Sequence, residues 1–235
     1  MSATKKIGVG IFGRTGRMGA ELSALLMKSA TFTIVDLFED QKRLKTTLSK
    51  PDIVIDFSSP SGSKTISKFC GDQKIPLVSG TTGLSPADEK NLKTLGKKIA
   101  VFRSANMSLG VNAMARALTL LTEDLKDFDI QIEEIHHRHK KDSPSGTAQF
   151  LKSKIEKSSG AKLFISPTVS VRAGEVFGIH KVYFFSKSEW LCIEHHAMNR
   201  TVFAEGALKA AQWLVKKKPG FYTMDNLLSS MVAKK

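Results

Sequence analysis

A chain of 235 residues with 41% hydrophobic and 25% charged residues fits one or two globular domains, which excludes a collagen, a coiled coil and a disordered chain. Its 36 Lys and Arg outnumber its 22 Asp and Glu, and the net charge of +14 predicts an anionic partner: a nucleic acid, a membrane surface or a small polyanion. The separate cysteines Cys70 and Cys192 indicate neither a disulfide framework nor a thiolate metal site.

The N-terminus, MSATKKIGVGIFG, contains an apolar run that is too short and too rich in glycine for a signal peptide. No later stretch reaches the ~18 apolar residues that a membrane-spanning helix needs. Together with the unpaired cysteines, these features lead us to expect a soluble, cytoplasmic protein.

The first 106 residues alternate short apolar runs with helical stretches. One helix carries Met18, Leu22, Leu25 and Leu26 at helical spacing. Strands are expected over residues 7–13, 31–38, 51–59, 75–82 and 99–106. Apolar strands that alternate with helices predict an α/β fold in which a doubly wound parallel sheet is covered on both faces.

The pattern changes after residue 110. A helix over 111–125, a strand over 129–137 and a helix over 147–157 come first. Alternating side chains then predict consecutive strands of an antiparallel or mixed sheet, over residues 163–174, 178–187 and 188–198. We expect a second, α+β domain here, followed by a helical tail over residues 201–215 and 221–231.

Two glycine patterns overlap near the N-terminus. Gly8, Gly10 and Gly13 match GxGxxG, but they lie within a strand, where no helix N-terminus can receive a phosphate. The turn GRTGRMG, with Gly13, Gly16 and Gly19, follows the strand and opens a helix. This second pattern therefore predicts a dinucleotide-binding turn.

A dinucleotide-binding turn is expected to be followed, about 20 residues later, by an acid that binds a ribose hydroxyl. Asp36 and Glu39 both qualify by spacing. The alternative is that the glycines only form a tight turn and a helix-packing contact, but the strand before, the helix after and the acid in range favour nucleotide binding.

Residues 133–148, EEIHHRHKKDSPSGTA, hold the densest chemistry of the chain. Imidazoles at His136, His137 and His139 suggest a metal site, but the cations among them and the alternation of side chains along a strand oppose it, so we predict no metal. A solvated basic strand end is one alternative. The favoured interpretation is an anion site that contains an acid/base histidine. The neighbouring cations lower the pKa of such a histidine and a bound dianion raises it, so the imidazole could exchange a proton near neutral pH.

A helix start follows in the same segment. Asp142 or Ser143 is a candidate N-cap, and Pro144 suits the first helical position. A carboxylate or a phosphate would fit the positive end of this helix, where N–H groups and hydroxyls come from Ser145, Gly146 and Thr147.

These motifs resemble the dihydrodipicolinate reductase family. The similarity rests in chain order on GRTGRMG, DFSSP, GTTG, SANMSLGVN and EIHHRHKKDSPSGTA, with support from VRAG, NRTVFAEGAL and PGFYTMDNLL. The resemblance implies a Rossmann-type dinucleotide-binding domain built from residues 1–106 and 200–235. It also implies a substrate-binding and oligomerisation domain over residues 107–199, and a homotetramer, although family segments that shape the tetramer are shortened before VRAG.

The resemblance further implies hydride transfer from NADH or NADPH to the dehydrated ring of 4-hydroxy-tetrahydrodipicolinate, in lysine and diaminopimelate biosynthesis. His136 is implied as the proton donor and Lys140 as a second catalytic group. The carboxylates of this small substrate would be held by His137, Lys140, Ser145, Gly146 and Thr147.

The cofactor residues are also carried over from the family. Glu39 corresponds to the ribose-binding acid, the pyrophosphate would lie on Gly13, Arg14, Thr15, Gly16, Arg17 and Met18, and the nicotinamide side would be lined by Gly80, Thr81, Thr82, Ser104, Ala105, Asn106 and Met107. Asp40 would repel the 2′-phosphate of NADPH, whereas Lys42 and Arg43 would compensate. The sequence favours NADH slightly and leaves NADPH open.

Three alternatives compete with this interpretation. A nucleic-acid-binding protein would explain the charge, but the lysines are spread over every predicted helix and no RNA- or DNA-binding motif is present. Another two-domain Rossmann dehydrogenase, such as one acting on an aspartate semialdehyde, would lack the HHRHKKDSPSGT string. A catalytically inactive nucleotide sensor on the same fold stays open.

Overall fold

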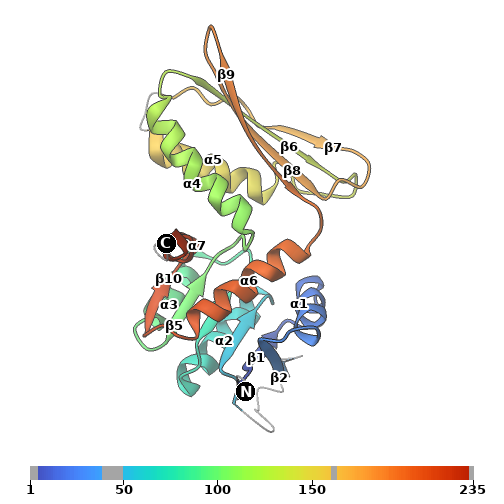
Figure 1. Ribbon diagram of the computed structural model, residues 1–235, viewed down its shortest axis with the longest axis vertical. Coiled ribbons are helices and arrows are strands. Elements are labelled where there is room, and N and C mark those ends of the chain that lie inside the picture. The colour runs from blue at the N-terminus through green and yellow to red at the C-terminus, as the bar shows by residue number, and fades with distance from the viewer. Residues whose placement is uncertain (1–4, 39–49, 160–162, 233–235) are drawn as a thin grey trace. The chain divides into compact units, whose positions relative to one another are not determined.

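The computed structural model describes residues 5–38, 50–159 and 163–232 (Figure 1). The chain divides into two compact units. The first combines residues 1–108 with residues 200–235, and the second comprises residues 109–199.

Six parallel strands form the sheet of the first unit, in the order β10-β5-β4-β3-β1-β2 (Figure 1). They are β1 (Ile7–Phe12), β2 (Phe32–Phe38), β3 (Ile53–Asp56), β4 (Leu77–Ser79), β5 (Ala100–Arg103) and β10 (Gly220–Tyr222). Every residue of β3, β4 and β5 is buried, as in a sheet covered on both faces. Because the strand order reverses between β1 and β3, their carboxyl ends form the switch point of a Rossmann-type sheet, and the predicted fold class is confirmed.

Helices of the first unit pack in pairs: α1 against α6, and α2 against α3. Their bounds, with those of the last helix, are α1 (Arg17–Met27), α2 (Pro60–Gln73), α3 (Pro86–Leu95), α6 (Thr201–Leu214) and α7 (Met224–Val232). Local signals set two of the starts. The Ser59 hydroxyl caps α2, and Ser85 and Asp88 form a reciprocal capping box at α3.

The tail of the chain differs from the predicted run of helix. Residues 220–222 form β10, which pairs with β5 in parallel, so a helix from residue 221 was wrong. Two aromatic contacts accompany the pairing with β5: Phe221 packs against an apolar cluster of the first unit, and the ring of Tyr222 stands edge-on to Trp213 at 5.3 Å between centroids. The packing of two aromatic rings stabilises the strand. It outweighs the helical pattern of the following residues, which would gain only about one turn if the helix began earlier.

The second unit is a mixed sheet, covered on one face by α4 (Leu109–Asp124) and α5 (Gly146–Ser159) (Figure 1). Its order is β7-β6-β8-β9, formed by β6 (Asp129–His136), β7 (Val169–Arg172), β8 (Gly178–Phe185) and β9 (Trp190–Ala197). β6 pairs with β7 in parallel and with β8 antiparallel, so the predicted α+β domain with a mixed sheet is confirmed. Alternation along β6 places four buried side chains on the covered face: Ile130, Ile132, Glu134 and His136.

Apolar side chains are exposed on the strands of the second unit. Trp190 is 63% exposed and Val169 47%, and Val171, Phe185 and Leu191 are also exposed. Exposed apolar groups of this number are typical of a protein–protein contact. Over the described part of the chain, none of the helices has the length and apolar character needed to cross a bilayer.

Candidate active site

The turn between β1 and α1 accepts only glycine at two positions. Gly13 has a φ of +89°, and a Cβ there would lie 2.6 Å from the Phe57 carbonyl oxygen. A Cβ on Gly19 would lie 2.3 Å from the Gly13 carbonyl oxygen. Gly16 takes the N-cap position of α1, so the positive end of this helix carries no capping side chain and presents its N–H groups to an anion, as the second glycine pattern requires.

A buried carboxylate ties together the loops that follow β3 and β4. Asp56 is 0% exposed and accepts hydrogen bonds from the Ser58 hydroxyl at 2.6 Å and the Thr81 hydroxyl at 2.9 Å. Burial raises the pKa of Asp56, which these hydrogen bonds lower only in part. The Phe57 ring fills the space beside Gly80, where a Cβ would lie 2.3 Å from the ring. Asp56 thereby fixes the segment Gly80–Thr82.

The segment after β5 is ordered by its own polar groups. The Ser104 amide donates to the Ser79 carbonyl at 3.2 Å, and the Ser104 hydroxyl donates to the Asn106 carbonyl at 2.6 Å. Met107 is buried. The loops after β1, β3, β4 and β5 therefore all gather at the carboxyl ends of the sheet, at the switch point where Rossmann-type sheets bind dinucleotides. Glu39 lies outside the described residues.

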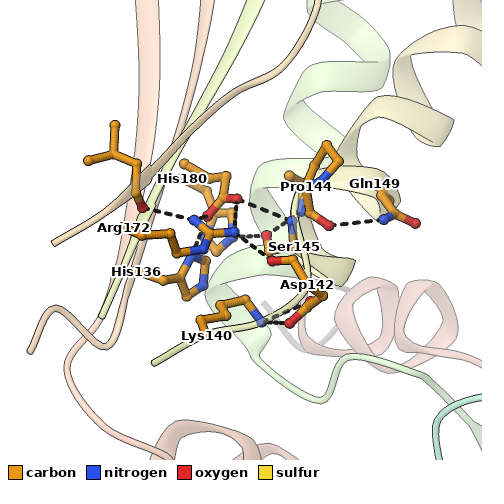
Figure 2. Close-up of polar contacts among 11 residues, drawn as sticks. His136, Lys140, Asp142, Pro144, Ser145, Gln149, Arg172 and His180 are labelled. Atoms are coloured by element: carbon orange, nitrogen blue, oxygen red, sulfur yellow. Dashed lines mark hydrogen bonds and ion pairs between the residues drawn. The ribbon is translucent and has the colours of Figure 1, made fainter. Parts of the chain in front are cut away.

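In the second unit, one buried carboxylate joins three segments of chain. Glu134 on β6 is 0% exposed, and its oxygens accept from both terminal nitrogens of Arg172, at 2.6 and 2.9 Å. The same carboxylate contacts Nδ1 of His136 and accepts from the Ser145 amide at 3.2 Å. Figure 2 shows Arg172, His136 and Ser145 converging on this point.

Charge and burial shift the pKa values of this cluster. Burial raises the pKa of Glu134, but the hydrogen bonds from Arg172 and His136 outweigh it and lower the pKa to about 2. Burial lowers the pKa of His136; the bond to Glu134 raises it in part, and the charges of Lys140 and Arg172 lower it further. Burial, followed by the charge of His136, lowers the pKa of His180 to about 3. Glu134 is therefore ionised and His180 neutral near pH 7.

The helix α5 starts differently from the prediction. Ser145 is the cap, because its hydroxyl accepts from the Ala148 amide at 3.2 Å. Asp142 and Ser143 were therefore wrong as N-cap candidates, and Pro144 precedes the helix instead of opening it. The Ser145 hydroxyl also hydrogen-bonds Nε2 of His180 at 3.0 Å, so a second buried histidine holds the helix start (Figure 2).

Among the other predicted substrate residues, Lys140 is connected to the buried cluster through Asp142. Its Nζ donates to both carboxylate oxygens of Asp142, at 2.7 and 2.9 Å, and the Asp142 carbonyl accepts from Arg172 at 2.6 Å (Figure 2). His136, Lys140 and Ser145 thus belong to one connected set. His137 is half-buried, and its ring is tilted by 39° to that of the exposed His139, with 6.2 Å between ring centroids.

Gly146 and Thr147 form the first turn of α5 after Ser145. Gly146 is exposed, and no atom lies within 4 Å of the place where its Cβ would be. Thr147 is half-buried. A side chain at position 146 would therefore extend into open space.

Three members of the cluster were missed by sequence reasoning: Glu134, Arg172 and His180. The period of two along a strand could have paired Glu134 with His136. The register of the strands brings Arg172 and His180 to the cluster. Arg172 on β7 is paired with His136, and His180 on β8 is paired with Glu134. Among residues 5–38, 50–159 and 163–232, no group of three or more His, Cys, Asp or Glu is placed to hold a metal ion.

A Rossmann-type sheet with a glycine turn at its switch point, together with an α+β unit that holds a buried histidine bonded to a carboxylate, defines the class: an NAD(P)H-dependent oxidoreductase. Family models agree over nearly the whole chain. The N-terminal part of dihydrodipicolinate reductase matches residues 7–107 and its C-terminal part matches residues 110–228. The chain belongs to the dihydrodipicolinate reductase family, which confirms the resemblance that the motifs indicated.

Curated relatives carry the same family name in its current form. A 4-hydroxy-tetrahydrodipicolinate reductase from Bdellovibrio bacteriovorus is 44% identical over 225 residues, which cover 95% of this chain and 97% of the relative. One from Nitratiruptor sp. is 36% identical over 251 residues, with 94% and 99% covered. Membership of this family excludes the alternative of a Rossmann dehydrogenase from another family.

Solved structures share the fold. A dipicolinate-bound dihydrodipicolinate reductase from Paenisporosarcina sp. has a TM-score of 0.81 at 20% identity, and the match covers 93% of this chain and 98% of that one. A probable dehydrogenase from Thermotoga maritima has a TM-score of 0.63 at 9% identity, with 96% and 94% covered. Both support the arrangement of a Rossmann-type sheet with a second mixed sheet.

Proposed function

We propose that this protein reduces 4-hydroxy-tetrahydrodipicolinate, the substrate in its relatives' name, to tetrahydrodipicolinate in lysine and diaminopimelate biosynthesis. In this reaction the ring loses its hydroxyl as water and gains a hydride and a proton. The observation that carries the proposal is the contact of buried Glu134 with His136 beside the start of α5. It supports an acid/base role for His136 next to a helix end that is suited to an anion.

We assign the dinucleotide to the unit formed by residues 1–106 and 200–235, and the substrate and oligomer contacts to residues 107–199. NADH or NADPH supplies the hydride when bound. The pyrophosphate would lie on the glycine turn, Gly13 to Met18, because this turn leads into the start of α1, which no side chain caps. Gly80–Thr82 and Ser104–Met107 would face the nicotinamide side, and NADH is the slightly favoured form.

His136 is proposed to deliver the proton. In the structure its pKa is lowered, chiefly by burial, so the imidazole is neutral near pH 7. A substrate with two carboxylates would raise that pKa and load the imidazole with a proton only when substrate is present. This coupling suits a general acid that acts near neutral pH.

The carboxylates of the substrate are assigned to His137, Lys140 and the helix start, Ser145 to Thr147. Lys140 pairs with Asp142, whose side chain is 57% exposed, so a substrate carboxylate can replace it at Nζ. Gly146 leaves open space at the end of α5. Ser145 contributes by fixing that end, since its amide is bonded to Glu134 and its hydroxyl to His180.

A homo-oligomer, the tetramer that the family resemblance implies, is proposed to cover the exposed apolar side chains of β7, β8 and β9. Trp190 and Val169 are among them. Light scattering coupled to size-exclusion chromatography measures the mass directly. A mass of four chains supports the tetramer, and a mass of one chain contradicts it.

The activity is tested by mixing the protein with NADH or NADPH and with cyclic substrate made in situ from pyruvate and aspartate semialdehyde by a dihydrodipicolinate synthase. We expect the absorbance of the reduced nicotinamide to fall only when the synthase is present, and the two rates give the cofactor preference. A folded protein that binds dinucleotide but shows no such loss with either cofactor would contradict the proposed function.

A further inference from the structure

We infer that Glu134 and Arg172 form a positioning pair, which fixes the imidazole of His136 with the proton on Nδ1 and leaves Nε2 as the nitrogen that exchanges a proton. The inference deepens the proposed function, because it specifies how the proposed proton donor is oriented. Neither Glu134 nor Arg172 is assigned a contact with the reacting atoms. They act through His136.

The carboxylate of Glu134 is held by several hydrogen-bond donors. Both oxygens of Glu134 accept from Arg172, at 2.6 and 2.9 Å, and one of them also accepts from the Ser145 amide at 3.2 Å. A buried carboxylate that accepts three such bonds is held in its ionised form. An ionised carboxylate can only accept hydrogen bonds, so the proton in its contact with His136 belongs to Nδ1.

The other ring nitrogen of His136, Nε2, has space beside it. With Nδ1 committed to Glu134, Nε2 of His136 is the nitrogen that gains and loses a proton. Gly178, the first residue of β8, lies beside it, and a Cβ at this position would be 3.0 Å from Nε2. The absence of a side chain at Gly178 therefore leaves room beside Nε2.

Arg172 balances the charge of the Glu134 carboxylate. A lone buried carboxylate would hold an imidazolium as a tight ion pair and would make His136 a poor proton donor. Arg172 neutralises Glu134, so the carboxylate orients the ring without trapping a proton there. Arg172 also donates to the Asp142 carbonyl at 2.6 Å, which couples this pair to the chain segment that carries Lys140.

The groups that face His136 come from four places in the second unit. They are Glu134 on its own strand, Arg172 on β7, His180 on β8 with ring centroids 5.1 Å apart, and Lys140 in the following loop. His180 is neutral near pH 7 because burial lowers its pKa to about 3. The fixed charges around the imidazole are therefore those of Glu134, Arg172 and Lys140.

The tautomer is measured directly by long-range ¹H–¹⁵N NMR on protein with ¹⁵N-labelled histidine, with His136 assigned by comparison with His136→Gln. We expect the wild-type protein near neutral pH to carry the His136 proton on Nδ1. We expect Glu134→Gln to lose this preference, because the amide can donate as well as accept. A wild-type proton on Nε2, or an unchanged tautomer in folded Glu134→Gln, would overturn the inference.

Kinetics give a second readout. Glu134→Gln is expected to lower kcat about 10- to 100-fold and to change KM by less than about threefold, with a shifted pH profile of kcat. Arg172→Lys should retain more activity than Arg172→Met, because lysine keeps the charge but not the two-pronged contact. The matched control is Glu133→Gln, since Glu133 is the adjacent carboxylate on the opposite face of β6 and should leave kcat, the pH profile and the tautomer unchanged. An unchanged kcat and pH profile in Glu134→Gln would count against the inference.

The tautomer also separates this inference from the proposed function. A wild-type protein with Nδ1 protonated but without substrate-dependent NAD(P)H oxidation would sustain the positioning pair and refute the proposed reaction. Since the wild-type spectrum needs no variant, the inference stays falsifiable if Glu134→Gln fails to fold.

Discussion

His136 is the last residue of β6 and lies on the covered face of the sheet, whereas its neighbours His137 and His139 follow the strand. It is 8% exposed and contacts an ionised carboxylate, whereas the side chain of His139 is 73% exposed. Three imidazoles within four residues thus have different environments, and one of them has the burial and partner that general acid catalysis needs.

At the residue scale, we expect His136→Gln to lower kcat about 10²- to 10⁴-fold with a small effect on KM, because it removes a proton donor and keeps the polar bulk. Steady-state kinetics with the in situ substrate measure both constants. His139→Gln is the matched control and should keep wild-type kcat. Equal turnover in His136→Gln and wild type would show that the proton comes from another group.

We expect Gly178→Ala to lower kcat up to about 10-fold, because the new Cβ would lie 3.0 Å from Nε2 of His136 and move the ring by a few tenths of an ångström. The midpoint of thermal unfolding should change little by comparison, since no backbone atom is among the three nearest to the new Cβ. Unaltered kinetics would mean that Nε2 of His136 does not take part.

At the scale of elements, the carboxylate of Asp56 holds together the loops of the candidate cofactor site in the first unit. Asp56→Asn should weaken NADH binding about 10-fold, because an amide donor would face the Thr81 or Ser58 hydroxyl and loosen the loops after β3 and β4. Quenching of protein fluorescence by NADH measures the dissociation constant. The matched control is Asp52→Asn, an exposed carboxylate at the opposite end of β3, whose bond to the Gly8 amide an amide oxygen can keep. Equal affinity in Asp56→Asn and wild type would exclude a role for Asp56 in shaping the cofactor loops.

Local patterns predicted most elements of the chain. The glycine turn after β1 and the helix starts at Ser59 and Ser85 follow from chemistry within four residues. β10 was missed because three residues become a strand only through pairing with β5, more than a hundred positions earlier. Local sequence carries no signal for such a contact.

In the candidate site, too, only the residues within one short segment could be predicted from the sequence. His136 and Lys140 lie in one string of residues, so their motif could be identified in the sequence. Arg172 reaches Glu134 from 38 residues away, and His180 reaches Ser145 from 35. These partners depend on the register of β6 with β7 and β8, which the sequence does not specify.

At the scale of the whole molecule, two buried groups link stability to pH. The pKa of Glu134 falls from 4.5 to about 2 on folding, so its stabilisation is complete above the unfolded pKa and is lost as pH falls toward 2. At about 1.36 kcal/mol per unit, this is on the order of 3 kcal/mol. The pKa of His180 falls from 6.5 to about 3, so the folded state also loses stability as the unfolded chain protonates below about pH 6.5.

We therefore expect the midpoint of thermal unfolding to decline on acidification in two stages, one that starts below about pH 6.5 and one below about pH 4.5. Circular dichroism over this range measures it. His180→Gln should weaken the upper stage, because its amide keeps a hydrogen bond to Ser145 but binds no proton, and Glu134→Gln should weaken the lower stage. Glu133→Gln, on the other face of β6, should retain both stages. Parallel curves for wild type and both variants would show that neither buried group carries the pH dependence.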